Sequence, residues 1–288
     1  MTTFAVSDKV DKLTNDVEVT TETIQDVRLS QHEREIRDWL SAPDPSIDHA
    51  HALKKRHKGT GVWFTSSQAF ADWENQSNSF LWLYGIPGCG KTVLSSTIIE
   101  QLNSDITPGQ IVLYFYFTFS DTNKQTLLNM LRSLVYQLYQ GQPDSRGPLE
   151  KLWRSSQAGQ RRPSERSLRE VLLAMLGKTN DASIVLDALD ESTTRSDLLP
   201  WLRSVLEAKS CSLRILVTAR REEDIESALR RWMQPGDGLN IQHGGVDQDI
   251  EAYVSHTVRH GEELEKWHKM PDVQDEMETE LVKKADGM

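Results

Sequence analysis

Residues 79–95 read SFLWLYGIPGCGKTVLS, and this stretch contains a glycine-rich loop directly after a short apolar segment. Within it, Gly85, Gly90, Lys91 and Thr92 stand at the GxxxxGK[ST] spacing of a phosphate-binding P-loop. The preceding residues are aromatic and apolar, as in a buried parallel strand, and the following apolar residues recur at helical spacing. A P-loop between a strand and a helix is therefore predicted.

The residue types of this loop suit the chemistry of phosphate binding. Glycines let backbone N–H groups fold around phosphate oxygens, and the helix N-terminus adds positive potential. Lys91 is expected to neutralise the β- and γ-phosphates, and the Thr92 hydroxyl to ligate Mg²⁺. The predicted nucleotide-binding residues are Gly85, Ile86, Pro87, Gly88, Cys89, Gly90, Lys91, Thr92 and Val93.

A second motif lies almost 100 residues further along, where an apolar run ends in a carboxylate. Residues 183–187, SIVLD, are typical of a Walker B strand, so Asp187 is predicted to hold Mg²⁺ together with Thr92. Asp190 and Glu191 follow, and either carboxylate can orient or deprotonate a water molecule. The alternative for Asp190 is capping of a helix N-terminus.

Residues 213–218, LRILVT, form another predicted buried strand, and arginines follow it directly. In this fold the carboxyl end of such a strand faces the γ-phosphate, so Arg220 is predicted to sense the third phosphate. The alternative is a surface salt bridge to Glu222 or Glu223, and this is the interpretation preferred for Arg221.

The remaining pattern predicts an α/β domain of the P-loop NTPase class, with a mainly parallel five-stranded sheet flanked by helices. Further strands are expected at 111–120 and 239–243, and a helix at 126–140. We expect three regions in the chain. They are a short helical N-terminal extension at 1–45, the nucleotide-binding domain at 46–260 and the helical start of a C-terminal region at 261–288.

Several segments allow more than one interpretation. The apolar stripe from Val6 to Val27 fits a partner-binding helix, a helix on its own domain, a frayed terminus or strand alternation. A solvated basic helix is preferred over a metal site for His49, His51 and His57, because no Cys or paired carboxylate accompanies them. Residues 59–61 form a turn that either contacts the purine or only connects elements. The arginine-rich stretch 154–166 is interpreted as a solvated loop rather than a phosphate-binding lid.

Composition limits the partners. The chain has 43 acidic and 33 basic residues and a net charge of −10, which opposes non-specific binding to nucleic acid or anionic membranes. Its apolar runs are too short for a membrane span, and two cysteines are too few for a disulfide framework. A cytoplasmic protein without nucleic-acid or membrane partners is expected.

The order and spacing of these blocks resemble NACHT-type signal-transduction NTPases, in particular fungal NOD-like proteins with a nephrocystin-type N-terminal module. The resemblance covers about residues 31–288. It is carried by WLSAPDPS, GTGVW, FLWLYGIPGCGKTVLSS, FYFTFSDTNKQT, LRSLVYQL, IVLDALDE, LVTARRE and DIEAYV.

The resemblance implies a nucleotide-dependent switch that holds ADP or GDP, exchanges it for ATP or GTP with Mg²⁺, and then forms homo-oligomers. By motif, Lys91, Thr92, Asp187 with the acids after it, and Arg220 correspond to the site residues of the family. A role in innate immunity or self/non-self recognition is expected, with slow hydrolysis or binding alone.

Two departures and two rival functions accompany this resemblance. Ala188 stands where many NACHT proteins have glycine, and the sequence ends at Met288, where relatives continue into a winged-helix domain, so a truncation is expected. A P-loop kinase is disfavoured because the strand at 111–120 lies between the two motifs and an acidic pair follows Asp187. A catalytically silent interaction module fits the sequence equally well.

Overall fold

The structure is a computed structural model that describes residue 29 and residues 31–242 and 245–285. The apolar stripe from Val6 to Val27 lies outside the described residues. Of the helices within these ranges, none is long and apolar enough to cross a bilayer. The three predicted regions, 1–45, 46–260 and 261–288, stay predictions.

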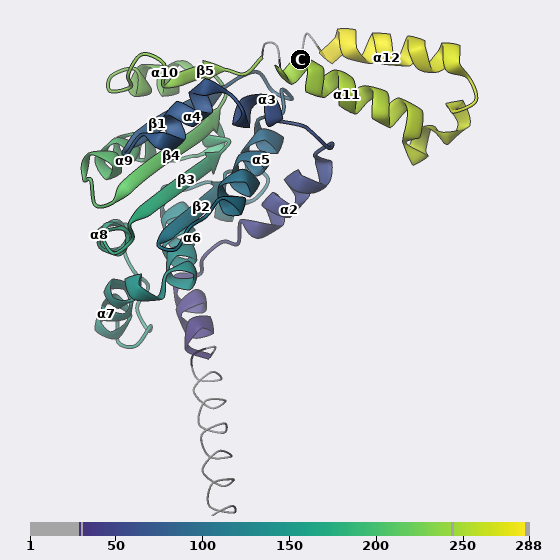
Figure 1. The fold of residues 1–288 in the computed structure, drawn as a ribbon. Coiled ribbons are helices and arrows are strands. Elements are labelled where there is room, and N and C mark those ends of the chain that lie inside the picture. The colour runs from purple at the N-terminus through teal and green to yellow at the C-terminus, as the bar shows by residue number, and fades with distance from the viewer. Residues whose placement is uncertain (1–28, 30, 243–244, 286–288) are drawn as a thin grey trace, which may run out of the picture.

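A five-stranded, all-parallel sheet forms the centre of the molecule (Figure 1), as the sequence predicted. Its spatial order is β2-β3-β4-β1-β5. The strands are β1 (Ser79–Tyr84), β2 (Gln110–Tyr116), β3 (Asp181–Asp187), β4 (Ser212–Ala219) and β5 (Gly238–Asn240). The register pairs Tyr84 with Ala219 and Tyr116 with Asp187, so the carboxyl ends of the four long strands meet at one edge.

One expectation about these strands needs correction. The strand expected at 111–120 ends at Tyr116, and it lies at the edge of the sheet. It separates the P-loop strand from the Walker B strand only along the chain. In space β4 takes that place, since β1 and β3 both pair with it.

Side chains of β1 alternate between the two faces of the sheet, and this alternation separates two cores. Phe80 and Trp82 pack into one, whereas Leu81 and Leu83 pack into the other. The first face is covered by α6 (Leu127–Gly141), α8 (Glu165–Leu176), α9 (Arg195–Glu207) and α10 (Glu223–Leu229). The second is covered by α3 (Val62–Thr65), α4 (Gln68–Asn75) and α5 (Lys91–Ser104).

The helices follow the sequence pattern closely. The side chain of Thr126 accepts a hydrogen bond from the Asn129 N–H and caps α6, whose apolar face is fully buried. The predicted helix at 126–140 is therefore confirmed to within one residue. Residues 31–40 are also helical, and Ile36, Trp39 and Leu40 join the first core.

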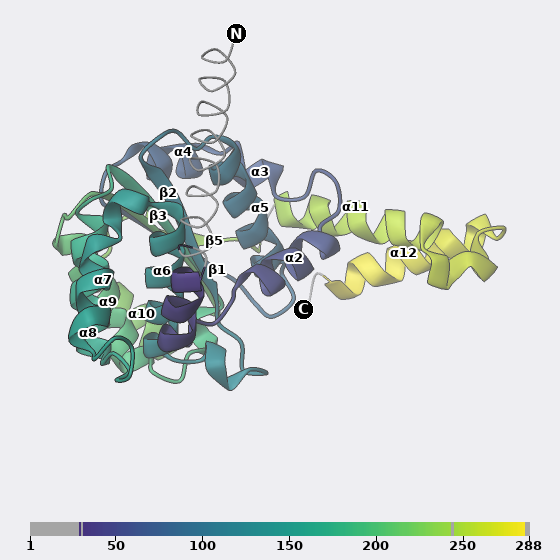
Figure 2. The ribbon, with the colours of Figure 1, turned by 90° about the horizontal axis from the view of Figure 1, so that it is seen from below.

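The peripheral elements lie around this centre. Two helices pack on its sides, α7 (Gly147–Ser155) on α8 and α2 (Ser46–Lys55) on α5. Short helical turns occur at η1 (Thr122–Lys124), η2 (Pro143–Ser145), η3 (Leu189–Glu191) and η4 (Glu262–Trp267). Figures 1 and 2 show α11 (Gly245–His260) and α12 (Pro271–Ala285) extending together away from the sheet.

The prediction of a solvated basic helix at α2 is wrong for one side of it. His49 is only 9% exposed; its Nδ1 lies 2.9 Å from the Tyr116 hydroxyl and its Nε2 3.1 Å from Glu100. Asp48 forms an ion pair with the buried Lys124. These partners are more than 50 residues away in the chain, so the local pattern did not reveal them.

The arginine-rich stretch 154–166 runs from the end of α7 through the connecting segment into the first turn of α8. Arg166 pairs with Glu170 in a largely exposed ion pair, as expected for a solvated segment. Arg161 differs, because its backbone carbonyl accepts a hydrogen bond of 2.6 Å from the indole of Trp39.

Ala188 follows β3 in the left-handed region of backbone space, with φ 53° and ψ 49°. Its N–H donates to the Thr218 hydroxyl at 3.0 Å, which holds the turn in place. A Cβ atom in this conformation costs about 1–2 kcal/mol, whereas glycine adopts it freely. Glycine at this position would remove a strain that Ala188 carries.

We expect Ala188→Gly to raise the free energy of unfolding by about 1 kcal/mol, because the strain at the left-handed position disappears. The contrasting variant is Ala182→Gly in the extended backbone of β3, where added flexibility and the loss of a buried methyl group lower the free energy of unfolding by about 1–2 kcal/mol. Chemical denaturation of both variants checks this pair. A lower stability for Ala188→Gly would contradict the strain.

Candidate nucleotide-binding site

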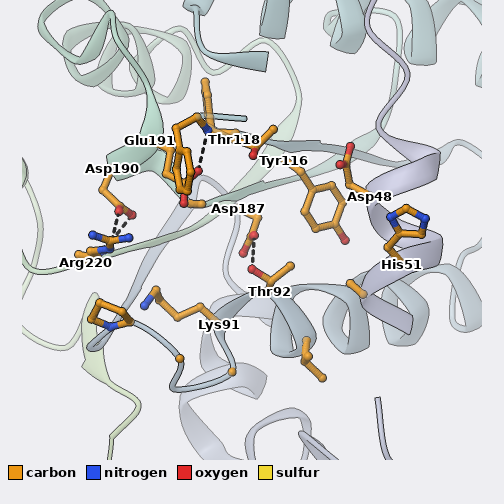
Figure 3. Close-up of a pocket in the computed structure, with 18 of the residues that line it drawn as sticks. Asp48, His51, Lys91, Thr92, Tyr116, Thr118, Asp187, Asp190, Glu191 and Arg220 are labelled. Carbon is orange, nitrogen blue, oxygen red and sulfur yellow. Dashed lines mark hydrogen bonds and ion pairs between the residues drawn. The ribbon is translucent and has the colours of Figure 1, made fainter. Parts of the chain in front are cut away.

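A cavity of about 490 Å³ opens at the carboxyl edge of the sheet. Its lining combines residues of the P-loop with residues that follow β3 and β4, and Figure 3 shows their side chains converging. The residues from the predicted set that line it are Pro87, Gly88, Gly90, Lys91, Thr92, Val93, Asp187, Asp190, Glu191 and Arg220. Gly85, Ile86 and Cys89 belong to the same loop but do not line this cavity.

The loop conformation requires its glycines. Gly88 and Gly90 both have φ near +82°, and a Cβ added at either position would meet no atom within 4 Å. Gly90 is also the N-cap residue of α5, and no side chain caps this helix end. Backbone N–H groups at the start of α5 therefore face open space, which is the arrangement that binds phosphate oxygens.

Lys91 is bound by the carbonyl oxygens of its own loop. Its ammonium donates to the carbonyls of Gly85 and Ile86, at 2.8 Å in each case. Gly85 has no room for a side chain, because a Cβ would lie 2.6 Å from the Cys89 sulfur. The absence of a side chain at Gly85 lets the loop fold closely, and the positively charged Lys91 ammonium lies beside the loop carbonyls.

Asp187 is the most deeply buried charged group of the site, at 2% exposure. Thr92 donates its hydroxyl to one carboxylate oxygen at 2.7 Å, while Ser95 and Thr218 donate to the other, each at 2.7 Å. Burial raises the pKa of Asp187, although the three hydroxyls and the nearby Lys91 act in the opposite direction.

The roles of Ser95 and Thr218 were not predicted from the sequence. Ser95 stands three residues after Thr92, on the same side of α5, and Thr218 ends an apolar run two residues before Arg220. The only indication in the sequence was a hydroxyl side chain at each of these positions. That both hydroxyls bond the same carboxylate became apparent only in the structure, where Asp187 lies between α5 and β4.

The pair of Thr92 and Asp187 fits a magnesium ion. Mg²⁺ takes hard oxygen ligands and is usually held by one or two protein oxygens, waters and substrate phosphates. The described residues contain no cluster of three or more His, Cys, Asp or Glu side chains able to hold a metal by themselves. A site with one hydroxyl and one carboxylate beside a phosphate loop matches this mode of binding.

Asp190 and Arg220 are partners of each other. One Asp190 oxygen accepts from the Arg220 backbone N–H at 2.9 Å, and the other lies 3.2 Å from its guanidinium Nε. Asp190 caps neither neighbouring helix, because it lies inside η3, whose N-cap is Ala188, and the N-cap of α9 is Thr194. The alternative partner for Arg221 is also wrong, since that arginine bonds Glu226 at 2.8 Å instead of Glu222 or Glu223.

Glu191 occupies a different environment. Its carboxylate accepts a hydrogen bond of 2.8 Å from the backbone N–H of Phe119, in the loop after β2. Burial raises the pKa of Glu191, although the Phe119 N–H acts in the opposite direction. Both residues line the cavity, and the Phe119 side chain is 72% exposed.

A second cavity of about 350 Å³ adjoins the first and shares Gly88, Gly90, Val93 and Lys55 with it. The turn at 59–61 and Trp63 form another part of its wall. Here Asp249 of α11 accepts hydrogen bonds from the Gly61 N–H at 2.7 Å and the Trp63 indole at 3.1 Å. The turn is therefore beside the P-loop, and it connects α11 to this side of the site.

The fold and the site together define an α/β domain of the P-loop NTPase-like class. A family model described as nephrocystin 3, N-terminal, matches residues 59–220, more than half of the chain, and the chain belongs to this family. Vegetative incompatibility protein HET-E-1 of Podospora anserina is 24% identical over 212 residues, which cover 70% of this chain and 15% of that protein. The chain thus matches only a small part of that relative. The two matches confirm the resemblance to a NACHT-type module.

We expect Asp187→Asn to leave the free energy of unfolding at pH 7, without nucleotide, at least as large as in the unmodified protein. The neutral amide removes a buried charge, and hydroxyl groups can reorient toward it. Asp181→Asn at the other end of β3 is the contrasting variant, because it breaks the partly buried ion pair with Arg214. That change should cost about 2 kcal/mol. Similar losses in urea titrations of both variants would contradict this account of Asp187.

Proposed function

We propose that this domain binds a nucleoside di- or triphosphate with Mg²⁺ and acts as a NACHT-type signalling module. The observation that carries the proposal is the 2.7 Å contact between the Thr92 hydroxyl and the Asp187 carboxylate at the start of α5. It joins the last residue of the P-loop to the end of the Walker B strand. A hydroxyl and a carboxylate so placed are suited to one Mg²⁺ between protein and phosphates.

Each part of the site has a role in this proposal. The N–H groups of residues 88–93 and the ammonium of Lys91 hold the β- and γ-phosphates, and Thr92 and Asp187 hold the ion. When bound, Mg²⁺ neutralises phosphate charge. The nucleotide base lies in the second cavity, beside Trp63. The walls of this cavity are compatible with adenine or guanine, so ATP/ADP and GTP/GDP are both candidates.

Slow hydrolysis is the proposed chemistry, with Glu191 as the residue that orients or deprotonates water. Both carboxylate oxygens of Asp190 contact Arg220. Glu191 also lines the cavity, but within the described part of the chain its carboxylate accepts only one hydrogen bond, from the Phe119 N–H, and so has oxygen lone pairs left for water. The raised pKa of Glu191 favours proton transfer. Arg220 is proposed to sense the γ-phosphate, by exchanging Asp190 for the phosphate.

A signalling role in the cytoplasm, with homo-oligomers formed in the triphosphate state, is proposed from the family resemblance. The name of the Podospora relative refers to vegetative incompatibility, and this supports a part in self/non-self recognition. A P-loop kinase that closes the arginine-rich stretch as a lid has no support, because none of the arginines in 154–166 lines the cavity.

Lys91→Ala is expected to lower nucleotide affinity about 100-fold, since a charge-assisted contact to the phosphates is lost. Lys178→Ala is the matched control, because Lys178 is exposed and precedes β3 at the opposite edge of the sheet. Isothermal titration with ADP, ATP, GDP and GTP measures both variants. Unchanged affinity in Lys91→Ala would exclude the proposed site.

Glu191→Gln is expected to retain triphosphate binding and to slow phosphate release at least tenfold, because the amide cannot accept a proton. Asp190→Asn is the comparison, and it should mainly disturb the position of Arg220. Phosphate release under saturating Mg²⁺-triphosphate separates the two. Normal turnover in Glu191→Gln, with loss in Asp190→Asn, would move the base to Asp190.

A further inference from the structure

Helix α2 presents one face to the cavity. Asp48, His51, Ala52 and Lys55 all line it, and their spacing of three, four and seven residues places them on one side of a helix. Figure 3 shows Asp48 and His51 on α2, across the cavity from Arg220. The helix therefore forms a wall of the site, although it ends 30 residues before the first glycine of the P-loop.

Buried polar contacts fix this wall in position. His49 joins α2 to the Tyr116 hydroxyl of β2 and to Glu100 of α5, and the ion pair of Asp48 with Lys124 joins it to η1. Separating groups buried in this way costs free energy, so α2 is held against the sheet and the P-loop helix. Lys55, two turns beyond Asp48, is consequently kept at the rim of the cavity.

The cations of the cavity differ in what they bind. Lys91 donates to two carbonyls, and Arg220 pairs with Asp190. Lys55 is exposed, and within residues 31–242 and 245–285 its ammonium has no hydrogen-bond or ion-pair partner. A nucleoside diphosphate carries several negative charges, and Lys55 is the cation whose charge is still available to them.

The position of Lys55 between the two cavities indicates which phosphate of a bound nucleotide it would contact. It lines both cavities, and these share Gly88, Gly90 and Val93, so Lys55 stands where the phosphate cavity passes into the second cavity. A nucleotide with phosphates in the first cavity and its base in the second must place its ribose and α-phosphate at this junction. The neighbouring Lys54 lines neither cavity.

We propose that Lys55 is a nucleotide-binding residue that contacts the α-phosphate, with α2 as the wall that carries it to the ligand. This inference rests on the proposed nucleotide function of the site. It adds an element to the site that lies outside the P-loop and the Walker B strand. Because the contact is to the α-phosphate, Lys55 strengthens binding of mono-, di- and triphosphates alike.

The test compares Lys55→Ala with Lys54→Ala, which removes the same charge from the adjacent position. Isothermal titration with ADP and GDP should show about tenfold weaker binding in Lys55→Ala and less than twofold change in Lys54→Ala. Lys55→Arg should restore most of the affinity. Competition by AMP or GMP should weaken in Lys55→Ala, whereas competition by adenosine or guanosine should not change. Thermal unfolding should be the same for all three variants.

The outcomes separate this inference from the proposed function. If Lys91→Ala loses affinity but Lys55→Ala binds diphosphates as Lys54→Ala does, the role of Lys55 is overturned and the site stands. Equal weakening of nucleoside and monophosphate binding would also overturn it. If the unmodified protein binds no nucleotide, or if Lys91→Ala binds normally, the proposed function and the role of Lys55 both fail.

Discussion

The buried carboxylate of Asp187 is the group on which the arrangement of the site depends. It ends the interior strand β3 and accepts hydroxyl hydrogen bonds from α5 on one side and from β4 on the other. A charge this far from water is stable only while such donors surround it. The position of α5, and with it the P-loop at its start, is therefore linked to the end of β4 through one side chain. The catalytic and sensing candidates, Glu191 and Arg220, follow these same two strands.

In the free protein the polar groups of the site already bond one another, so a ligand has to replace these contacts. The Thr92 hydroxyl bonds a carboxylate where a metal ion would bind, the Lys91 ammonium bonds loop carbonyls where phosphate would bind, and Arg220 bonds Asp190. Each contact satisfies a polar group in the free protein, and each can be exchanged for a stronger, charge-assisted contact. The net affinity is then the difference between two sets of contacts, and this keeps it moderate.

Local sequence predicted the sheet and the motif residues, because strand ends and loop glycines are determined by neighbours in the chain. The apolar run before Asp187 placed the carboxylate at the correct edge, and GxxxxGK[ST] placed Lys91 and Thr92 beside it. The pairing of Asp190 with Arg220 was not predictable in this way. Neither was the burial of His49, since Tyr116 and Glu100 reach it only after the strands have assembled. Long-range polar pairs depend on the complete packing of the chain.

The hydrogen bond from the Gly61 N–H to Asp249 attaches the first turns of α11 to the turn at 59–61, and the rest of the helix extends away from this contact. The helix runs on from Asp249 to His260, about 17 Å at 1.5 Å per residue. It carries α12 with it through Arg259, which pairs with Asp275 and Glu278. A rotation of about 10° at Asp249 moves the far end of α11 by about 3 Å over that length. Under such a rotation, a small displacement at the wall of the second cavity would become a larger one at the far end of the α11–α12 pair, well away from the site itself.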